Sequence, residues 1–253
     1  MMEQFSEYAY YYNSFYRDKD YAKEAKDIDY LLKKYGNSIS NIISFGCGTG
    51  NHDVELSKLG YCCHGIDLSS SMIEVAIKNA KNENLNNTYE VADIRHYNAH
   101  DSYDAVISLF HVMSYQVDND DIDNAIKSAR KALVSGGMLL FDVWYGPGVL
   151  RDLPSVRIKE VEDDHNRMIR LCKPDIYENS NRVDVNYEIL VIDKSSGIAK
   201  NINETHHMRY FFRPELEMIL CQNGFKLIDT FDCKDLGNTS FESWTSYFLA
   251  KAI

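Results

Sequence analysis

Three glycines at alternate positions, Gly46, Gly48 and Gly50, follow a short apolar run and precede a helical segment that ends at Gly60. A second apolar run comes next and stops at Asp67. Glycine lets the backbone turn sharply and approach a ligand closely, where a Cβ would collide. A carboxylate about twenty residues beyond such a loop can accept hydrogen bonds from both ribose hydroxyls of an adenosine. The pattern therefore predicts a site for an adenosine-containing cofactor.

The spacing of the glycines distinguishes two classes of cofactor. A dinucleotide fingerprint requires Gly or Ala at position 51, where this chain has Asn51, and the third glycine here comes one residue early. The spacing G-x-G-x-G with a downstream acid is typical of enzymes that use S-adenosylmethionine, which carries no pyrophosphate. We therefore expect S-adenosylmethionine as the cofactor and S-adenosylhomocysteine as its product. A glycine-rich turn in another α/β protein is the alternative interpretation.

Strands and helices alternate around this loop. Apolar periodicity predicts a helix over 20–35, and Ser69 is placed to cap another. Further apolar runs predict strands near 88–92, 103–110 and 138–143. Strands separated by helices imply a parallel, doubly wound sheet.

The pattern changes after Trp144. Residues 145–155 contain two of the four prolines and are predicted to form a loop, and 156–212 then alternate in the manner of antiparallel strands. We expect an α/β fold with a mostly parallel, seven-stranded Rossmann-like sheet and an inserted antiparallel cover. The expected parts are N-terminal helices and cofactor-binding core over 1–145, the inserted sheet over 146–212, and the last helix and two core strands over 213–253.

Composition restricts the function. The 253 residues are 45% hydrophobic, which supports a full core, and the net charge of −11 argues against a nucleic-acid partner. No apolar run approaches the length of a membrane span, and the N-terminus has no basic region before an apolar core, so no signal peptide is expected. The six cysteines form no C-x-x-C pair and are expected to be reduced thiols. We expect a cytoplasmic monomer or homodimer with a small-molecule substrate.

Several segments share the pattern of one enzyme family. They are YNSFYRDKDYAKEAKDI (12–28), CGTGNH (47–52), GIDLSSSM (65–72), ADIRHY (92–97), DVWYGP (142–147) and ETHHMRYF (204–211). The chain resembles class I S-adenosylmethionine-dependent methyltransferases. Within them it resembles the N,N-dimethyltransferases that act on nucleotide-linked amino sugars of the desosamine and mycaminose type, and the likeness extends over most of its length.

The resemblance implies which residues bind the cofactor. They are Gly46, Cys47, Gly48 and Gly50 near the methionine part, Asp67 at the ribose, Met72, Asp93 and Ile94 at the adenine, Phe110 and His111 at the sulfonium end, and also Leu68. Tyr12, Tyr16 and Tyr21 are implied to belong to N-terminal helices that close over the cofactor. Aromatic faces attract a sulfonium, which gives these tyrosines a physical reason to be there.

Three departures from the family pattern change these expectations. Relatives usually carry Asp two residues before the first glycine, where this chain has Ser44, so a carboxylate near the amino end of the cofactor is expected to be missing. The loop after the fourth strand has Tyr115 in place of a histidine. The segment SFESWTSYFLAK (240–251) lacks the arginine that in relatives reaches the nucleotide diphosphate, which weakens the case for a nucleotide-linked acceptor.

Methyl transfer requires an acceptor amine without its extra proton, or an alcohol that loses its proton during attack. The candidate catalytic residues are His206 and Glu204 on the inserted sheet, with Tyr12 and Tyr115 as helpers. Residues two apart on a strand share a face, so Glu204 can orient His206, whereas His207 points to the opposite face. A hydrogen-bonded structural histidine is the alternative interpretation of His206.

The residues leave several functions open. N-methylation of an amino sugar or a similar polar amine comes first, and O-methylation of a sugar or another small metabolite comes second. A nucleic-acid methyltransferase is disfavoured, because the expected N/D-P-P-Y/F motif is replaced by SLFH at 108–111. A module that binds the cofactor without turnover is a further alternative, which Ser44 supports. No set of residues has metal-ligand spacing, so no metal is expected and a metal-dependent catechol-type O-methyltransferase is disfavoured.

Overall fold

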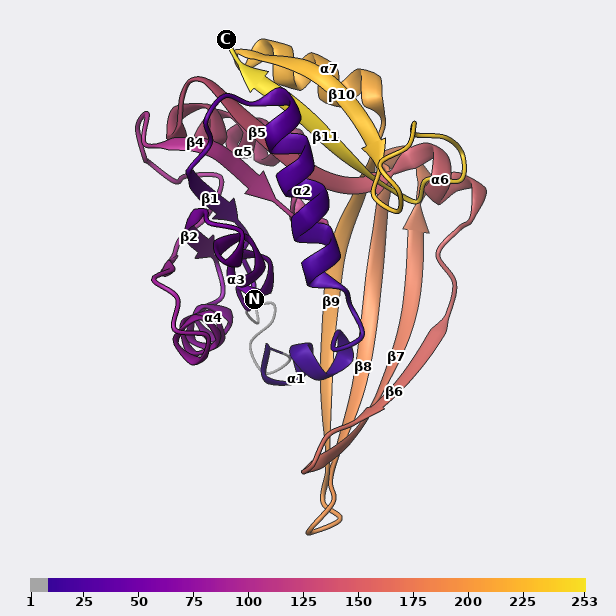
Figure 1. The fold of residues 1–253 in the computed structure, drawn as a ribbon. Helices are drawn as coiled ribbons and strands as arrows, with labels where there is room; N and C mark the ends of the chain where they lie inside the picture. The colour runs from indigo at the N-terminus through magenta and orange to yellow at the C-terminus, as the bar shows by residue number, and fades with distance from the viewer. Residues whose placement is uncertain (1–8) are drawn as a thin grey trace.

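Five parallel strands form the centre of the structure (Figure 1). The computed structural model describes residues 9–253; residues 1–8, where no signal peptide is expected, lie outside the described residues. The strands run in the order β3 (Thr88–Val91), β2 (Cys62–Asp67), β1 (Asn41–Phe45), β4 (Tyr103–Ser108) and β5 (Leu133–Tyr145). β11 (Thr245–Ala252) pairs antiparallel with β5, and β10 (Phe225–Asp232) pairs antiparallel with β11. The expected mostly parallel, seven-stranded sheet is thus confirmed.

Helices cover both faces of this sheet. Adjacent residues of a strand point to opposite sides, so each strand contributes side chains to two cores. Ile42 packs in a cluster with α2 (Tyr21–Tyr35) and α3 (Asn51–Lys58), whereas Ile43 packs in a cluster with α5 (Asn119–Ala132) and α7 (Arg213–Gln222). Each of these strand residues is fully buried. α4 (Ser70–Asn82) begins after Ser69, whose hydroxyl accepts from the backbone N–H of Met72, as its predicted capping role requires.

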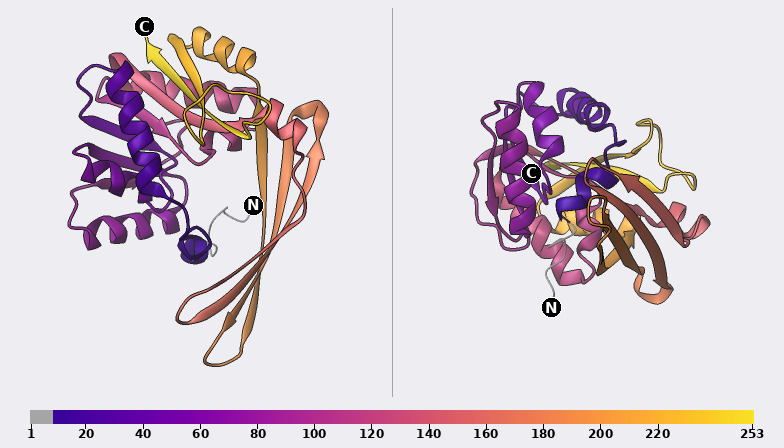
Figure 2. Two further views of the ribbon diagram at one scale, coloured as in Figure 1. Left: turned by 45° about the vertical axis from the view of Figure 1, so that its right-hand side comes forward. Right: turned by 90° about the horizontal axis from the view of Figure 1, so that it is seen from below.

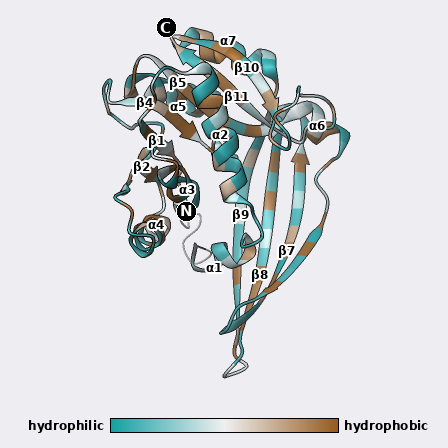
Figure 3. Cartoon of the chain, in the orientation of Figure 1, coloured by the Kyte–Doolittle hydropathy of each residue, from teal (hydrophilic) through white to brown (hydrophobic). Residues whose placement is uncertain are grey.

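A second sheet of four long antiparallel strands extends away from the core (Figures 1 and 2). Its strands are β6 (Arg157–Glu162), β7 (Asn166–Tyr177), β8 (Arg182–Asp193) and β9 (Ala199–Phe211). Polar and apolar residues alternate along them (Figure 3), which is the pattern of strands with one covered face. β9 joins this sheet to the core through two parallel pairs, Trp144 with Tyr210 and Tyr145 with Phe211.

The short helix α1 (Ala9–Phe15) connects the second sheet to the glycine loop. Phe15 is fully buried among apolar side chains from β6 to β9. The side-chain oxygen of Asn13 accepts hydrogen bonds from the Thr49 hydroxyl at 2.9 Å and from the Asn51 amide at 3.2 Å. α1 therefore fixes the distance between the two parts of the molecule.

The predicted loop over 145–155 is partly wrong, because residues 146–151 form the helix α6 (Gly146–Arg151). Pro147 is its second residue, where the missing N–H costs no intrahelical hydrogen bond. The strand before it is also longer than predicted and begins at Leu133, with an irregular register opposite Tyr103. Among residues 9–253, no helix combines the length and the apolar character needed to cross a bilayer.

Gly148 sets the contact between α6 and the C-terminal loop. A Cβ at this position would lie 2.1 Å from the carbonyl oxygen of Ser243 and 3.0 Å from the Cα of Trp244. Both neighbours are backbone atoms, which cannot move without displacing the loop. The close approach therefore requires glycine.

We predict that Gly148→Ala lowers the free energy of unfolding by about 1–3 kcal/mol, the usual cost of overpacking. Gly237→Ala in the same C-terminal loop is the matched control, because its added Cβ would approach only the Asp235 side chain, at 2.9 Å. Urea denaturation of both variants measures the difference. Equal losses in the two would contradict the assignment.

Candidate active site

A cavity of about 1640 Å³ lies between the carboxyl ends of the parallel strands and the antiparallel sheet. In open α/β sheets, ligands bind outside the carboxyl ends of the strands. The glycine loop, the ends of β2, β4 and β5, and the residues around α1 line one part of this cavity. β7, β8 and β9 line the other part, so one space is lined by most of the predicted site residues, Gly50 and Glu204 excepted.

The glycine loop has the backbone that its sequence predicts. Gly46, Gly48 and Gly50 have φ values of 70°, 54° and 72°, which are left-handed and favour glycine. The backbone N–H groups of Gly46 and Cys47 both donate to the carbonyl of Ile66, at 2.8 and 2.9 Å, so the loop is tied to β2. A Cβ at Gly48 would have no atom within 4 Å, and Gly48 lines the cavity.

Asp67 lies at the end of β2, beside the loop. Its carboxylate accepts from the backbone N–H of Gly48 and from that of Ser69, each at 2.9 Å. Burial raises the pKa of Asp67, and the backbone donors oppose this effect. A carboxylate has about four acceptor positions, so it can still accept a hydrogen bond from a ligand hydroxyl group. Leu68, next in the chain, is 59% exposed at the cavity wall.

Met72, Asp93 and Ile94 all line the cavity. Asp93 and Ile94 come shortly after β3, which ends at Val91. Both carboxylate oxygens of Asp93 accept from the guanidinium of Arg95, the shortest hydrogen bond being 2.6 Å. Desolvation raises the pKa of Asp93, but the hydrogen bonds from Arg95 outweigh it and keep this pKa below its usual value. Arg95 also donates to Asp121 at 3.0 Å. The sequence analysis did not single out Arg95, because its partner Asp121 is far away in the chain.

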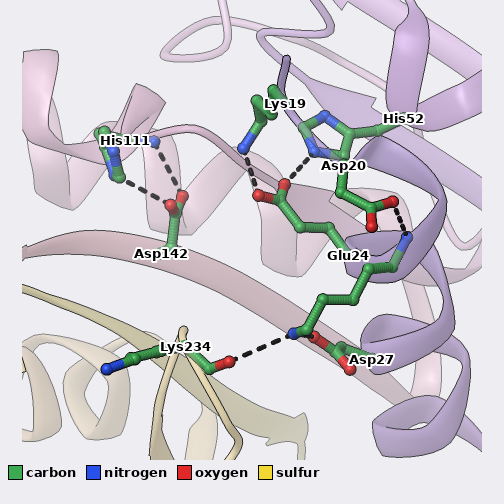
Figure 4. A network of polar contacts seen from close by, with 9 residues as sticks. Lys19, Asp20, Glu24, Asp27, His52, His111, Asp142 and Lys234 are labelled. Carbon is green, nitrogen blue, oxygen red and sulfur yellow. Dashed lines mark hydrogen bonds and ion pairs between the residues drawn. The ribbon is translucent and has the colours of Figure 1, made fainter.

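Phe110 and His111 lie beyond the fourth strand rather than at its end, because β4 stops at Ser108. Both have left-handed φ values, 64° and 68°. Strained backbone of this kind persists only where surrounding contacts hold it. Here the backbone N–H of His111 donates to Asp142 at 2.8 Å, and its ring Nδ1 lies 2.9 Å from the other carboxylate oxygen (Figure 4).

Aromatic rings surround Phe110. The ring centroid of Tyr16 lies 5.0 Å from that of Phe110, and the centroid of Tyr12 lies 6.2 Å away, both edge-on. The ammonium of Lys19 lies 4.4 Å from the Phe110 centroid. Tyr12 belongs to α1, whereas Tyr16 lies just after that helix. This group of rings suits a cationic centre.

Lys19 also pairs with Glu24, whose other oxygen lies 2.6 Å from Nε2 of His52 (Figure 4). Desolvation raises the pKa of Glu24, but His52 and Lys19 outweigh it and bring this pKa to about 2. Tyr21, the first residue of α2, contacts His52 edge-on at 4.9 Å, and burial raises its pKa to about 12. The sequence analysis missed this group because its members come from separate elements.

Three of the four predicted catalytic residues form a hydrogen-bonded chain. The hydroxyl of Tyr115 lies 2.7 Å from Nδ1 of His206, and Nε2 of His206 lies 2.9 Å from a carboxylate oxygen of Glu204. His206 is 2% exposed, and the Tyr187 ring contacts it edge-on at 5.0 Å. Burial raises the pKa of the Tyr115 hydroxyl well above its ordinary value.

Glu204 contacts His206, whereas Nδ1 of His207 lies 2.7 Å from Asp184, but both histidines line the cavity. Tyr12 lines the same cavity. Among residues 9–253, no group of three or more His, Cys, Asp or Glu side chains is placed to hold a metal ion. The catalytic roles themselves stay predictions.

Comparison with known proteins gives the same class. Residues 42–137 match the model of a methyltransferase domain. The chain is 26% identical over 218 residues to the dTDP-3-amino-3,4,6-trideoxy-alpha-D-glucopyranose N,N-dimethyltransferase of Streptomyces venezuelae, covering 85% of this chain and 89% of that protein. It is 22% identical over 211 residues to the dTDP-3-amino-3,6-dideoxy-alpha-D-glucopyranose N,N-dimethyltransferase of Streptomyces fradiae, covering 83% and 80%.

A solved structure extends the likeness to the whole fold. An S-adenosylmethionine-dependent methyltransferase from Clostridium acetobutylicum superimposes with a TM-score of 0.81 at 20% identity, covering 97% of this chain and 98% of that one. The matched domain, the relatives and the fold are those of S-adenosylmethionine-dependent methyltransferases, and the chain is similar to this class. Within it, the chain resembles the N,N-dimethyltransferases of nucleotide-linked amino sugars.

The residues fit S-adenosylmethionine. Gly48 leaves room for a close ligand, Asp67 has free acceptor positions beside it, and Met72 and Ile94 supply buried apolar surface. Bound there, S-adenosylmethionine supplies an electrophilic methyl group on a sulfonium. The aromatic rings around Phe110 lie in the same cavity.

We predict that Gly48→Ala weakens binding of S-adenosylhomocysteine by about tenfold or more, because the new methyl group enters the cavity. The free energy of unfolding of Gly48→Ala should fall only by about 1–2 kcal/mol, the cost of placing a side chain on left-handed backbone. Gly46→Ala has the same strain, but its Cβ would also lie 2.4 Å from Cγ1 of Val112, so it should destabilise more.

Calorimetric titration and urea denaturation of both glycine variants separate the two effects. Wild-type affinity in Gly48→Ala would show that the ligand does not approach this position. A larger loss of stability in Gly48→Ala than in Gly46→Ala would contradict the steric account.

Proposed function

We propose that the protein transfers a methyl group from S-adenosylmethionine to the amine of an amino sugar. The observation that carries this proposal is the hydrogen-bonded chain of Tyr115, His206 and Glu204, in which Tyr115 and His206 line the same cavity as the glycine loop. Such a chain can accept a proton, and an amine acceptor must give one up. Two relatives that match more than four fifths of this chain are named as amino-sugar N,N-dimethyltransferases, which supports the same substrate class.

The roles of the three residues follow from their hydrogen bonds. An Nε2–H on His206 donates to Glu204, which leaves Nδ1 as the acceptor of the Tyr115 hydroxyl proton. As the acceptor amine loses its proton to the Tyr115 oxygen, the phenol proton moves to Nδ1. Glu204 then stabilises the imidazolium that forms. Positioning of the acceptor lone pair contributes further, since orientation alone can supply about 7–11 kcal/mol.

A nucleotide-linked form of the sugar is favoured by positive charge at the cavity. Arg151 and Arg157 both line it, and planar guanidinium groups bind phosphate oxygens well. Arg151 comes from α6 but pairs with Glu242, so its guanidinium lies beside the C-terminal segment from which the family arginine is absent. The dTDP-linked acceptors in the names of the relatives support the same conclusion.

We predict that incubation with S-adenosylmethionine and a dTDP-linked 3-amino-3,6-dideoxyhexose adds one or two methyl groups to the acceptor. Mass spectrometry follows the product, and Asp67→Ala should abolish it. Two matched acceptors serve as controls: the same nucleotide sugar with a hydroxyl in place of the amine, and the amino sugar without the nucleotide. Methylation of the hydroxyl analogue alone would replace the proposal with O-methylation, and no product despite cofactor binding would refute this substrate class.

We predict that His206→Asn lowers kcat for the amine acceptor by about 10²–10⁴-fold, the usual contribution of a general base. The remaining rate should rise with pH, because the variant depends on acceptor that is already deprotonated. The affinity for S-adenosylhomocysteine should stay unchanged, since His206 hydrogen-bonds to Tyr115 and Glu204, which lie outside the glycine loop.

His207→Asn is the matched control for His206→Asn, because it changes the same residue type one position along β9, but His207 contacts Asp184 instead of Tyr115 and Glu204. It should keep most of the activity. Equal losses in the two variants would assign the effect to the strand and would contradict a proton-accepting role for His206.

A further inference from the structure

A buried carboxylate lies where the sequence appeared to lack one. Asp53 is the third residue of α3, and the hydroxyl of Ser44 at the end of β1 donates to its Oδ1. The two side chains are 1% and 4% exposed. Ser44 therefore contacts a carboxylate, and this carboxylate comes from α3 instead of from position 44 of β1.

The second oxygen of this carboxylate has no hydrogen-bond partner among residues 9–253. No ion pair joins Asp53 to a cationic side chain in the described part of the chain either. A buried charge without a partner is costly, so such groups normally bind a cation or stay neutral. Asp53 is among the residues that line the cofactor cavity, together with Cys47, Gly48 and Thr49.

We propose that Asp53 binds the ammonium group of the cofactor's methionine part, with Ser44 as the residue that orients its carboxylate. The proposal rests on the unpaired oxygen, its place at the glycine loop and the hydrogen bond from Ser44. It concerns the cofactor alone and is independent of the acceptor.

The groups that face Asp53 from the surrounding elements are neutral. They are the thiols of Cys47 and Cys63 and the phenol of Tyr89, and burial raises the pKa of each. Burial likewise raises the pKa of Asp53 to about 7, against the opposing hydrogen bond from Ser44. An ammonium ligand favours the ionised carboxylate and lowers this pKa, so binding near pH 7 releases part of a proton. Affinity therefore falls as the pH drops below 7, because more Asp53 is protonated.

The test compares S-adenosylhomocysteine with its analogue that lacks the α-amino group. In the wild type, loss of the amino group should weaken binding by about 10- to 100-fold, the usual effect of a hydrogen bond to a charged group. Asp53→Asn should bind the two compounds with nearly equal affinity. Asp67→Asn is the matched control, since it removes a carboxylate of the same cavity but should keep the preference for the amino group.

Two further readouts separate a ligand-binding role from a structural one. Without ligand at pH 8, Asp53→Asn should have a higher Tm than the wild type, because it removes a buried carboxylate that is largely ionised at this pH. Calorimetry in buffers of different ionisation enthalpy should show proton release at pH 7 for the wild type and none for the variant. If Asp53→Asn does not fold, Ser44→Ala gives a milder test, with a smaller loss of the same preference.

Equal weakening of both compounds by Asp53→Asn would overturn the proposal, since Asp53 would then act on the shape of the loop. An unchanged preference for the amino group in the folded variant would also overturn it. Both results leave the methyltransferase class and the amino-sugar acceptor untouched.

Discussion

The cavity depends on how β5 and β9 meet. They pair in parallel over only two positions, Trp144 with Tyr210 and Tyr145 with Phe211, before the strands diverge. Tyr210 and Phe211 are almost fully buried, so the junction is held by apolar packing as well as by strand pairing. Because the antiparallel sheet leaves the core at this point, its inner face looks back at the carboxyl ends of the parallel strands. Without this divergence, Tyr115 and His206 would not face one cavity.

The pKa values of the carboxylates around the cavity depend on their neighbouring side chains. Glu24 is stabilised by Lys19 and His52, and Asp93 by Arg95, so desolvation is more than offset in both. Asp53 has only the Ser44 hydroxyl, and its pKa is raised. Burial alone therefore does not explain why the pKa is lowered in Glu24 and Asp93 but raised in Asp53. The presence of a cationic neighbour does, because it lowers the pKa of Glu24 and Asp93, whereas Asp53 and Asp67, for which only neutral hydrogen-bond donors oppose the burial, have raised pKa values.

The sequence predicts those parts of the site that are local in the chain. The glycine loop and Asp67 are encoded by backbone requirements and spacing, and the pair of Glu204 and His206 follows from the period of a strand. The contact of Tyr115 with His206 joins residues 91 positions apart, so local periodicity could not give it. Asp53 could not be predicted as a site residue, because nothing in the chain shows that α3 lies against the end of β1. The short helix α6 was not predicted, because the two prolines of residues 145–155 favour a loop.

The antiparallel sheet ends in β6, whose outer edge is paired with no other strand among residues 9–253. An edge strand of this kind presents unpaired N–H and C=O groups that invite strands of other molecules. Four of the six residues of β6 are charged, and Lys159 is turned inward to donate to the carbonyl of Phe15 at 2.6 Å. Charge on an edge makes the addition of a further strand costly. The long sheet that forms half of the cavity is thereby protected from aggregation along the edge that its length exposes.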